Sequence, residues 1–222
     1  QVTFAPVTPA LWTAESVEIT TNLVGDEVPD NDTFYSALIC LPLNVTGLAN
    51  NAQTDQFVQF NLANPGVLNA LPNSYTGSYF IAGADWKNGQ WLGVEYDDGT
   101  LATDNYVNID PLTGIYTDQG DLGAALMGNA WDDTHDIMYG VASTGYLYVM
   151  DPATGAIGVG DSLWYNLEGT NYSLANIGGL MIDIAYDNTN NILYGIDLGN
   201  DCLWTINPAT YELTLVGFLG ID

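Results

Sequence analysis

The chain has almost no positive charge. It contains one Lys or Arg in total (Lys87) and one histidine (His135), against 27 Asp and Glu residues, so its formal net charge is −26. Nucleic acids and anionic membrane surfaces are bound mainly through Lys and Arg, and both are therefore excluded as partners. Phosphoryl transfer that depends on Arg or Lys clamps is excluded for the same reason.

Charged residues of either sign are also few, at 13% of the chain, which is about half the usual share. The surface must therefore be mostly neutral and polar, with isolated carboxylates that have almost no cationic partners. Such a chain repels itself unless cations screen or bind it. Disorder is disfavoured, because 47% hydrophobic and 12% aromatic residues are enough for a core.

Long apolar runs are absent as well. No stretch reaches the roughly 18 apolar residues of a spanning helix, so we expect no membrane insertion. The first residue is Gln1 rather than Met, which indicates a mature N-terminus from which a signal peptide has been removed. These features predict an extracellular or cell-surface protein.

A tandem repeat is the most informative feature present. Each clear copy begins with an aromatic or aliphatic residue, has Asp-Pro or Asn-Pro at its centre and continues with Thr and a turn residue. Clear copies occupy residues 106–114, 147–155 and 203–211, and a worn copy occupies residues 57–66. A period of about 40 to 55 residues indicates an array of one supersecondary unit.

Each unit is predicted to form four short strands. In the best-defined unit these are residues 127–131, 137–141, 146–150 and 156–159. Aromatic and β-branched residues alternate there with small or polar ones, and Asp, Pro and Gly mark the turns. Four antiparallel strands per unit are typical of a propeller blade. The prediction is an all-β fold, a β-propeller of about four four-stranded blades with an N-terminal arm.

We expect an arm at residues 1–15 and a single β-propeller domain at residues 16–222. The predicted repeats lie near residues 16–72, 78–123, 125–164 and 179–219. In the divergent first repeat, strands are expected at residues 16–24, 34–41, 56–62 and 67–71. Residues 165–178 are expected to be an insertion, and the aromatic positions 86, 131 and 186 to be equivalent. The propeller either closes within one chain or forms an open arc that a neighbouring chain closes.

The repeat also resembles a known group of proteins. Its pattern, Leu-Tyr-x-Ile-Asp-Pro-x-Thr-Gly and a short strand ending in Leu-Val-Gly, is similar to repeat propellers of secreted and cell-surface bacterial proteins, many of them from the Bacteroidetes lineage. The stretch 178–187 followed by 192–195 is the closest. The resemblance covers residues 78–222 well and 34–72 loosely. It implies an extracellular scaffold or adhesion role and no shared catalytic residues.

Catalysis has little support in the sequence. His135 is the only histidine and lies in a predicted turn without a neighbouring cysteine or a nucleophile-elbow serine, so a solvated turn residue is the expected role. Carboxylate pairs that hydrolyse glycosides occur in some propellers, but most Asp residues here lie in turns, where backbone capping accounts for them. We therefore expect a non-catalytic protein and rank a carboxylate-based glycoside hydrolase third.

Calcium is the one cofactor that the sequence favours, because hard oxygen ligands suit it. Two acidic loops are candidates, with solvated acidic turns as the alternative for each. The candidate ligands are Asp26, Glu27, Asp30, Asp32, Asp132, Asp133 and Asp136.

Two covalent features fit an exported chain. Cys40 and Cys202 are the only cysteines and lie in the first and last repeats, which become neighbours when a propeller closes, so they are candidates for a disulfide; two buried thiols are the alternative. Candidate glycosylation acceptors are Asn31, Asn44, Asn171 and Ser162.

Two functional classes compete. The first is an extracellular structural or adhesive protein whose copies self-associate into a surface layer or filament. Its N-terminal arm has apolar residues outside the repeat, which can add a strand to a neighbour's sheet edge. These residues are Val2, Phe4, Val7, Leu11 and Trp12. The second is a secreted monomeric propeller that binds a glycan or a surface protein.

Overall fold

The computed structural model describes residues 14–20, 33–39, 46–51, 53–77, 80–96 and 105–220, and for the first two ranges only the backbone. The regular secondary structure of the described part is almost all β-strand, and its only helix is the 3-10 turn η2 (Leu174–Ile177). The all-β prediction is thereby confirmed.

The N-terminal strands differ from the predicted first repeat. Strands β1 (Ala14–Thr20) and β2 (Thr33–Ile39) pair with each other in a separate two-stranded sheet. The first sheet instead contains β3 (Thr46–Asn51), β4 (Gln56–Asn61) and β5 (Asn64–Ser74), in that order. We did not predict β3, because Thr-Gly-Leu-Ala-Asn-Asn has little strand propensity. Gly47 on β3 lies beneath the ring of Phe60 on β4, so packing between the two strands supports β3 where its own sequence does not favour a strand.

The next two sheets follow the repeat closely. The second sheet contains β6 (Phe80–Lys87), β7 (Gln90–Tyr96), β8 (Asn105–Ile109) and β9 (Tyr116–Asp121). The third contains β10 (Gly128–Asp132), β11 (Ile137–Val141), β12 (Tyr146–Met150) and β13 (Ile157–Ser162). Both are antiparallel meanders in chain order, and the strands predicted for the best-defined unit are confirmed with small shifts at their ends.

The fourth sheet has two strands more than predicted. Its meander is β16 (Met181–Asp187), β17 (Ile192–Asp197), β18 (Cys202–Asn207) and β19 (Glu212–Phe218). The expected insertion forms the hairpin β14 (Trp164–Leu167) and β15 (Thr170–Ser173), followed by η2. Strand β14 runs parallel to β19 and pairs with it at Glu212 and Leu213.

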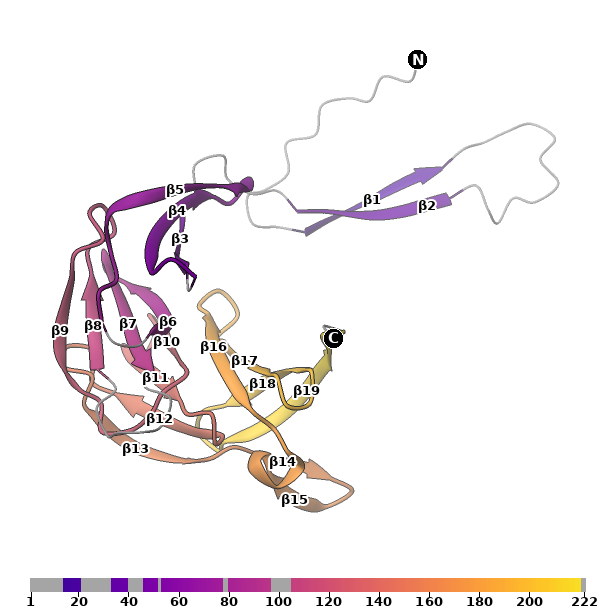
Figure 1. Ribbon diagram of the computed structural model, residues 1–222. Helices are drawn as coiled ribbons and strands as arrows, with labels where there is room; N and C mark the ends of the chain where they lie inside the picture. The colour runs from indigo at the N-terminus through magenta and orange to yellow at the C-terminus, as the bar shows by residue number, and fades with distance from the viewer. Residues whose placement is uncertain are drawn as a thin grey trace. The chain divides into compact units, whose positions relative to one another are not determined.

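The chain divides into two compact units, residues 1–49 with 58–70, and residues 50–57 with 71–222. Within the second unit, the inner strand β10 contacts both β6 and β16, so three meanders follow one another through their first strands (Figure 1). Their registers place Trp86, Trp131 and Tyr186 opposite equivalent residues of the following strand. The expected equivalence of these aromatic positions is confirmed, and the arrangement is propeller-like.

The Asp-Pro turns explain where many of the carboxylates are used. The Asp110 side chain accepts hydrogen bonds from the backbone N–H groups of Leu112 and Thr113, at 2.8 and 2.9 Å. These bonds lower the pKa of this exposed carboxyl below its usual range. Asn207 accepts equivalent bonds from Ala209 and Thr210, which an amide oxygen does equally well.

Candidate functional site

The packing between successive sheets repeats one contact. The first residue of each motif copy, which we call the lead residue, lies on the strand next to the outermost strand of its meander, which is β4, β8, β12 or β18. The lead residues Phe57, Tyr106 and Leu147 are 0%, 0% and 1% exposed. Gly114 of the second sheet lies against Phe57, and Gly155 of the third sheet lies against Tyr106, both at φ +74°. Each glycine therefore forms the positive-φ turn and also permits close approach to the preceding lead residue.

Two apolar clusters fill the junctions inside the second unit. In one, Leu92, Val94 and Tyr106 of the second sheet pack with Trp131 and Met138 of the third. The other contains the residues at the same three positions of the third sheet, packed with residues of the fourth. This second set comprises Tyr139, Val141 and Leu147 from the third sheet with Ile184, Leu193, Trp204 and Ile206 from the fourth.

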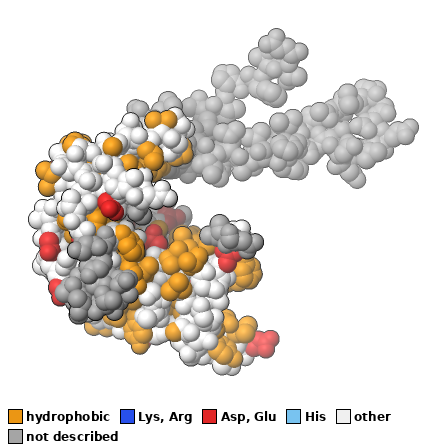
Figure 2. All heavy atoms as spheres, viewed as in Figure 1, with side chains coloured by type: hydrophobic (Ala, Val, Ile, Leu, Met, Phe, Trp, Pro, Cys, Tyr) orange, Lys and Arg blue, Asp and Glu red, His pale blue; other side chains and the backbone are white. Residues whose placement is uncertain are grey.

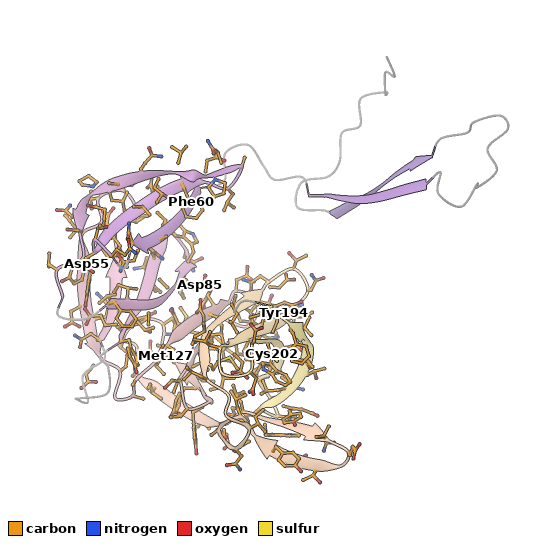
Figure 3. The ribbon with its side chains drawn as sticks, turned by 45° about the vertical axis from the view of Figure 1, so that its right-hand side comes forward. Asp55, Phe60, Asp85, Met127, Tyr194 and Cys202 are labelled. Atoms are coloured by element: carbon orange, nitrogen blue, oxygen red, sulfur yellow. The ribbon has the colours of Figure 1, made fainter. Side chains whose placement is uncertain are left out.

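Among the residues that the structure describes, none gives the fourth sheet the corresponding cover. The strand registers make Tyr194, Ile196 and Leu203 equivalent to the three buried residues of each preceding sheet. All three are only half-buried and belong to neither apolar cluster; Tyr194 is labelled in Figure 3. We call the surface of these three residues the open face. It is the candidate functional site, because an apolar face at a repeated packing position is suited to contact with another sheet.

Polar side chains also tie neighbouring sheets together. Asp85 on β6 accepts a 2.7 Å hydrogen bond from the backbone N–H of Trp131 on β10. Asn188, after β16, donates to the Trp131 carbonyl at 3.1 Å and accepts from the Asp133 backbone N–H at 2.8 Å. The role of Asp85 was not predicted from the sequence. The strand registers make Asp85 equivalent to Ala130 of the third sheet.

Two inner-strand carboxyls are poorly solvated. Burial raises the pKa of Asp85, although hydrogen bonds from Trp131 and Trp86 oppose the rise. Burial also raises the pKa of Asp183, on β16, to about 6, and the negative charge of Asp85 adds to this effect. Asp183 lies against Gly128 on β10, where a side chain larger than hydrogen would collide with it.

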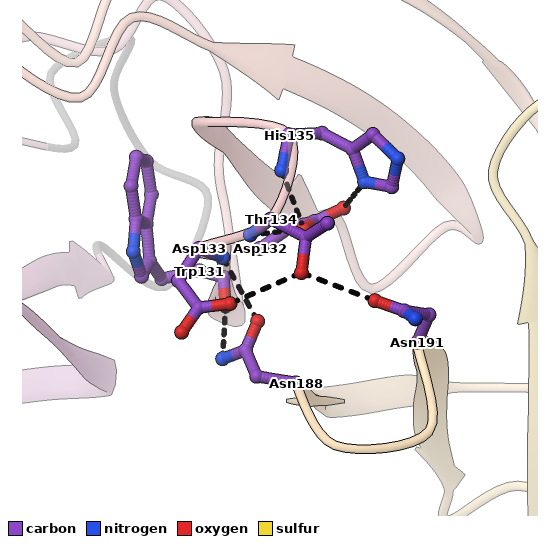
Figure 4. Close-up of polar contacts among 7 residues, drawn as sticks. All are labelled: Trp131, Asp132, Asp133, Thr134, His135, Asn188 and Asn191. Carbon is purple, nitrogen blue, oxygen red and sulfur yellow. Dashed lines mark hydrogen bonds and ion pairs between the residues drawn. The ribbon is translucent and has the colours of Figure 1, made fainter.

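His135 has a local partner (Figure 4). Its Nδ1 atom lies 2.7 Å from an oxygen of Asp132, which is 1% exposed and also accepts from the backbone N–H groups of Thr134 and His135 at 3.0 Å. Burial alone would raise the pKa of Asp132, but hydrogen bonds from His135 and Tyr186 bring it below its usual value. Asp132 thus holds the turn between β10 and β11, a structural task.

The three predicted calcium ligands of this turn point to different partners. The Asp132 carboxylate contacts His135, the Asp133 carboxylate accepts from the Thr134 hydroxyl at 3.3 Å, and the Asp136 carboxylate lies 3.7 Å from the Lys87 ammonium. Within the described ranges there is no group of three or more His, Cys, Asp or Glu side chains placed to hold a metal ion. The other candidates, Asp26, Glu27, Asp30 and Asp32, lie outside the described residues.

Cys202 is buried as a free cysteine, and its thiol donates to the Asn200 carbonyl at 3.0 Å. Burial raises the pKa of this thiol, and Asp197 and Asp201 add to the rise. Its proposed partner Cys40 lies outside the described residues, so the disulfide stays a prediction.

The remaining sequence candidates divide in the same way. Asn171 is exposed on β15, and Ser162 is half-buried at the end of β13. Outside the described residues lie Asn31, Asn44 and the arm residues Val2, Phe4, Val7, Leu11 and Trp12.

Sequence reasoning missed two buried carboxylates at one repeat position. Glu95 accepts from the Tyr75 hydroxyl and, at 2.8 Å, from the Asn105 side chain. Its equivalent, Asp197, accepts from the Leu180 backbone N–H at 2.7 Å and from the Trp204 indole at 3.2 Å. The available signal was that each follows the glycine of the second strand by two residues. Both carboxylates have hydrogen-bond partners inside the sheets, so we assign them a structural role.

No protein-family model matches the chain, and no curated protein matches it by sequence. Among solved structures, a protein of unknown function from Bacteroides thetaiotaomicron is similar, with a TM-score of 0.54 and 16% identity over 80% of this chain and 42% of that chain. An auxiliary nutrient binding protein from Bacteroides ovatus has a TM-score of 0.50 and 13% identity over 81% of this chain and 43% of its own. This chain therefore spans less than half the length of either, and the likeness concerns the fold.

Membrane insertion through a helix has no candidate in the described residues, none of whose helices has the necessary length and apolar character.

Proposed function

We propose that this chain is a non-catalytic, extracellular structural protein whose copies associate with one another through the open face. The repeats are, in this proposal, successive propeller blades, and the open face is the surface on which the next blade would pack. One observation carries it: the lead residues of the first three copies are at most 1% exposed, whereas Leu203 of the last copy is half-buried.

The energetics favour cover for such a face. Fully burying an exposed large apolar side chain is worth about 1.5–3 kcal/mol. The three residues of the open face are already half-buried, so covering them adds roughly half of this amount each and offsets part of the entropy lost when two copies meet. The titratable groups that would suit catalysis are already engaged. His135 is held by Asp132, and Glu95 and Asp197 are hydrogen-bonded inside their sheets, which supports a non-catalytic role.

The extracellular location rests on the resemblance to secreted bacterial repeat propellers and on the near absence of Lys and Arg. In such a setting, dissolved cations would screen the net charge of −26 and permit copies to approach. Calcium bound by the acidic loop at residues 26–32, the candidate that lies outside the described residues, would add to this effect.

Sedimentation velocity tests the proposal. The purified chain should associate reversibly as its concentration rises in buffer with physiological salt and calcium, and Leu203→Glu should shift it to monomer. The control is Val159→Glu, which adds the same charge at a residue 79% exposed on β13 and should leave association intact. A wild-type chain that stays monomeric at high micromolar concentration contradicts the proposal and favours a monomeric glycan- or protein-binding module.

A further inference from the structure

The carboxylates are unevenly distributed along the chain. Of the 27 Asp and Glu residues, Asp55 is the only one between residues 33 and 84. This segment includes the whole of the first sheet. Elsewhere the acidic side chains are scattered singly over the surface in view (Figure 2). The first sheet is thus the part of the protein that another negatively charged copy approaches with the least repulsion.

Strand β5 gives this sheet an unprotected edge. It is the last strand in the order β3-β4-β5, and residues 64–70 are all exposed, including Val67 and Leu68 at 53% each. Edge strands usually carry charge or proline that discourages pairing. Strands β9 and β13 have acidic residues on them, whereas β5 has none, and its prolines, Pro65 and Pro72, lie near its ends.

We propose that the β5 strand of one copy covers the open face of the fourth sheet of a second copy. This inference rests on the proposed function and names the surface that the second copy supplies. The molecule already contains a contact of related kind, because each buried lead residue is covered by the sheet that follows it. That cover comes from the first two strands of the following sheet and from its Gly turn, whereas here the outer strand β5 would supply it. The first sheet of another copy would stand where a following sheet would stand.

Charge decides between β5 and the other obvious occupant, a second open face. The fourth meander, residues 181–219, has five carboxylates (Asp183, Asp187, Asp197, Asp201 and Glu212), whereas the first sheet, residues 46–74, has one. Two open faces brought together would therefore bring two meanders with five carboxylates each toward one another, and no Lys or Arg lies in that segment to offset them. Like charges brought together are strongly disfavoured. A contact between different surfaces is head-to-tail, and it builds an open chain of copies when its rotation does not close.

Capping variants test this geometry. A head variant, V67E/L68E, removes the β5 surface, and a tail variant, I196E/L203E, removes the open face. Each alone should be monomeric, with an association constant weakened at least about 100-fold by the buried charge. An equimolar mixture should form a heterodimer and nothing larger, since each variant keeps one intact surface. Circular dichroism confirms folding, and V67T/L68T with I196T/L203T replace any variant that does not fold.

The outcomes separate the two proposals. If the wild-type chain does not associate, the proposed function fails and this inference with it. If the wild-type chain associates and the head variant associates equally well, the open faces meet each other or another surface, and only this inference is overturned. A mixture that remains monomeric overturns it too. So does a wild-type monomer whose β5 and open face become cross-linked within one chain, because the ring then closes on itself.

Discussion

Replacing Asp183 by Asn should stabilise the protein at neutral pH. The side chain is half-buried on the inner strand β16, lies against Gly128, and has its pKa raised from 3.8 to about 6 by burial and by the charge of Asp85. The folded state therefore prefers the protonated form. As pH rises from about 4 through 6, ionisation is easier in the unfolded chain, so the free energy of unfolding falls, and the loss is complete above pH 6.

A rise of this size corresponds to about 3 kcal/mol at pH 7, which solvent screening reduces to roughly 1–2 kcal/mol. Asp183→Asn keeps the shape and the oxygen that accepts from the Ile184 backbone N–H at 2.9 Å, and it removes the charge. Urea unfolding should show the gain at pH 7 and little difference from wild type at pH 4, below both pKa values.

Glu168→Gln, at an exposed carboxylate in the β14–β15 turn, is the matched control for the general loss of one negative charge. If Asp183→Asn is no more stable than this control at pH 7, or if its gain is the same at pH 4, then burial of Asp183 does not penalise its charge and the reasoning is refuted.

Three further outcomes are expected. Gly155→Ala should destabilise the protein by roughly 2–4 kcal/mol, because Gly155 has φ +74° and lies against Tyr106. The control Gly169→Ala, at φ +84° in open space, should lose only about 1 kcal/mol of stability. Equal losses in thermal unfolding would contradict the argument that Gly155 is needed for close approach to Tyr106. The melting temperature should rise with salt and more steeply with calcium, and an unchanged value after chelation at low salt would remove both the screening and the calcium arguments. Mass spectrometry of the unreduced chain decides between the Cys40–Cys202 disulfide predicted from the sequence and the free Cys202 thiol of the structure, and two free thiols would end the disulfide prediction.

The repeat predicted the third sheet well for a physical reason. Each of its strands is bounded by residues that force a turn, such as Asp151-Pro152 before Gly155, and its alternating pattern leaves one register that buries the apolar side chains. Turn residues and alternation also predicted the strands of the second and fourth meanders. They did not predict β3, a strand of weak propensity with Gly47 packed beneath the Phe60 ring. They also did not predict the β14–β15 hairpin, whose Glu168-Gly169 turn has two positive φ angles and was a usable hairpin signal.

The candidate site was predictable only in part. Aligning the motif copies makes Leu203 equivalent to Leu147, so the position could be found from sequence. Whether a given lead residue is buried depends on which sheet packs against it, and the local sequence around the residue does not indicate which sheet that is. In the same way, Asp85 and Asp183 looked like two of many acidic residues, because their desolvation arises where β6, β10 and β16 meet.

Exposure of apolar side chains is ordinary when they lie singly in turns or on outer strands, as Leu112 and Ile115 do before β9 and Val159 does on β13. The open face is different, because its residues adjoin one another on β17 and β18 and occupy positions that are buried in both preceding sheets of the second unit. Strongly acidic proteins resist close contact between copies, so a contact surface is expected where charge is sparse. Uncharged side chains form the open face, and the first sheet has one carboxylate. The described carboxylates are largely engaged in turns and sheet junctions. A functional site made of carboxylates would therefore leave the open face and the sparsely charged first sheet unexplained.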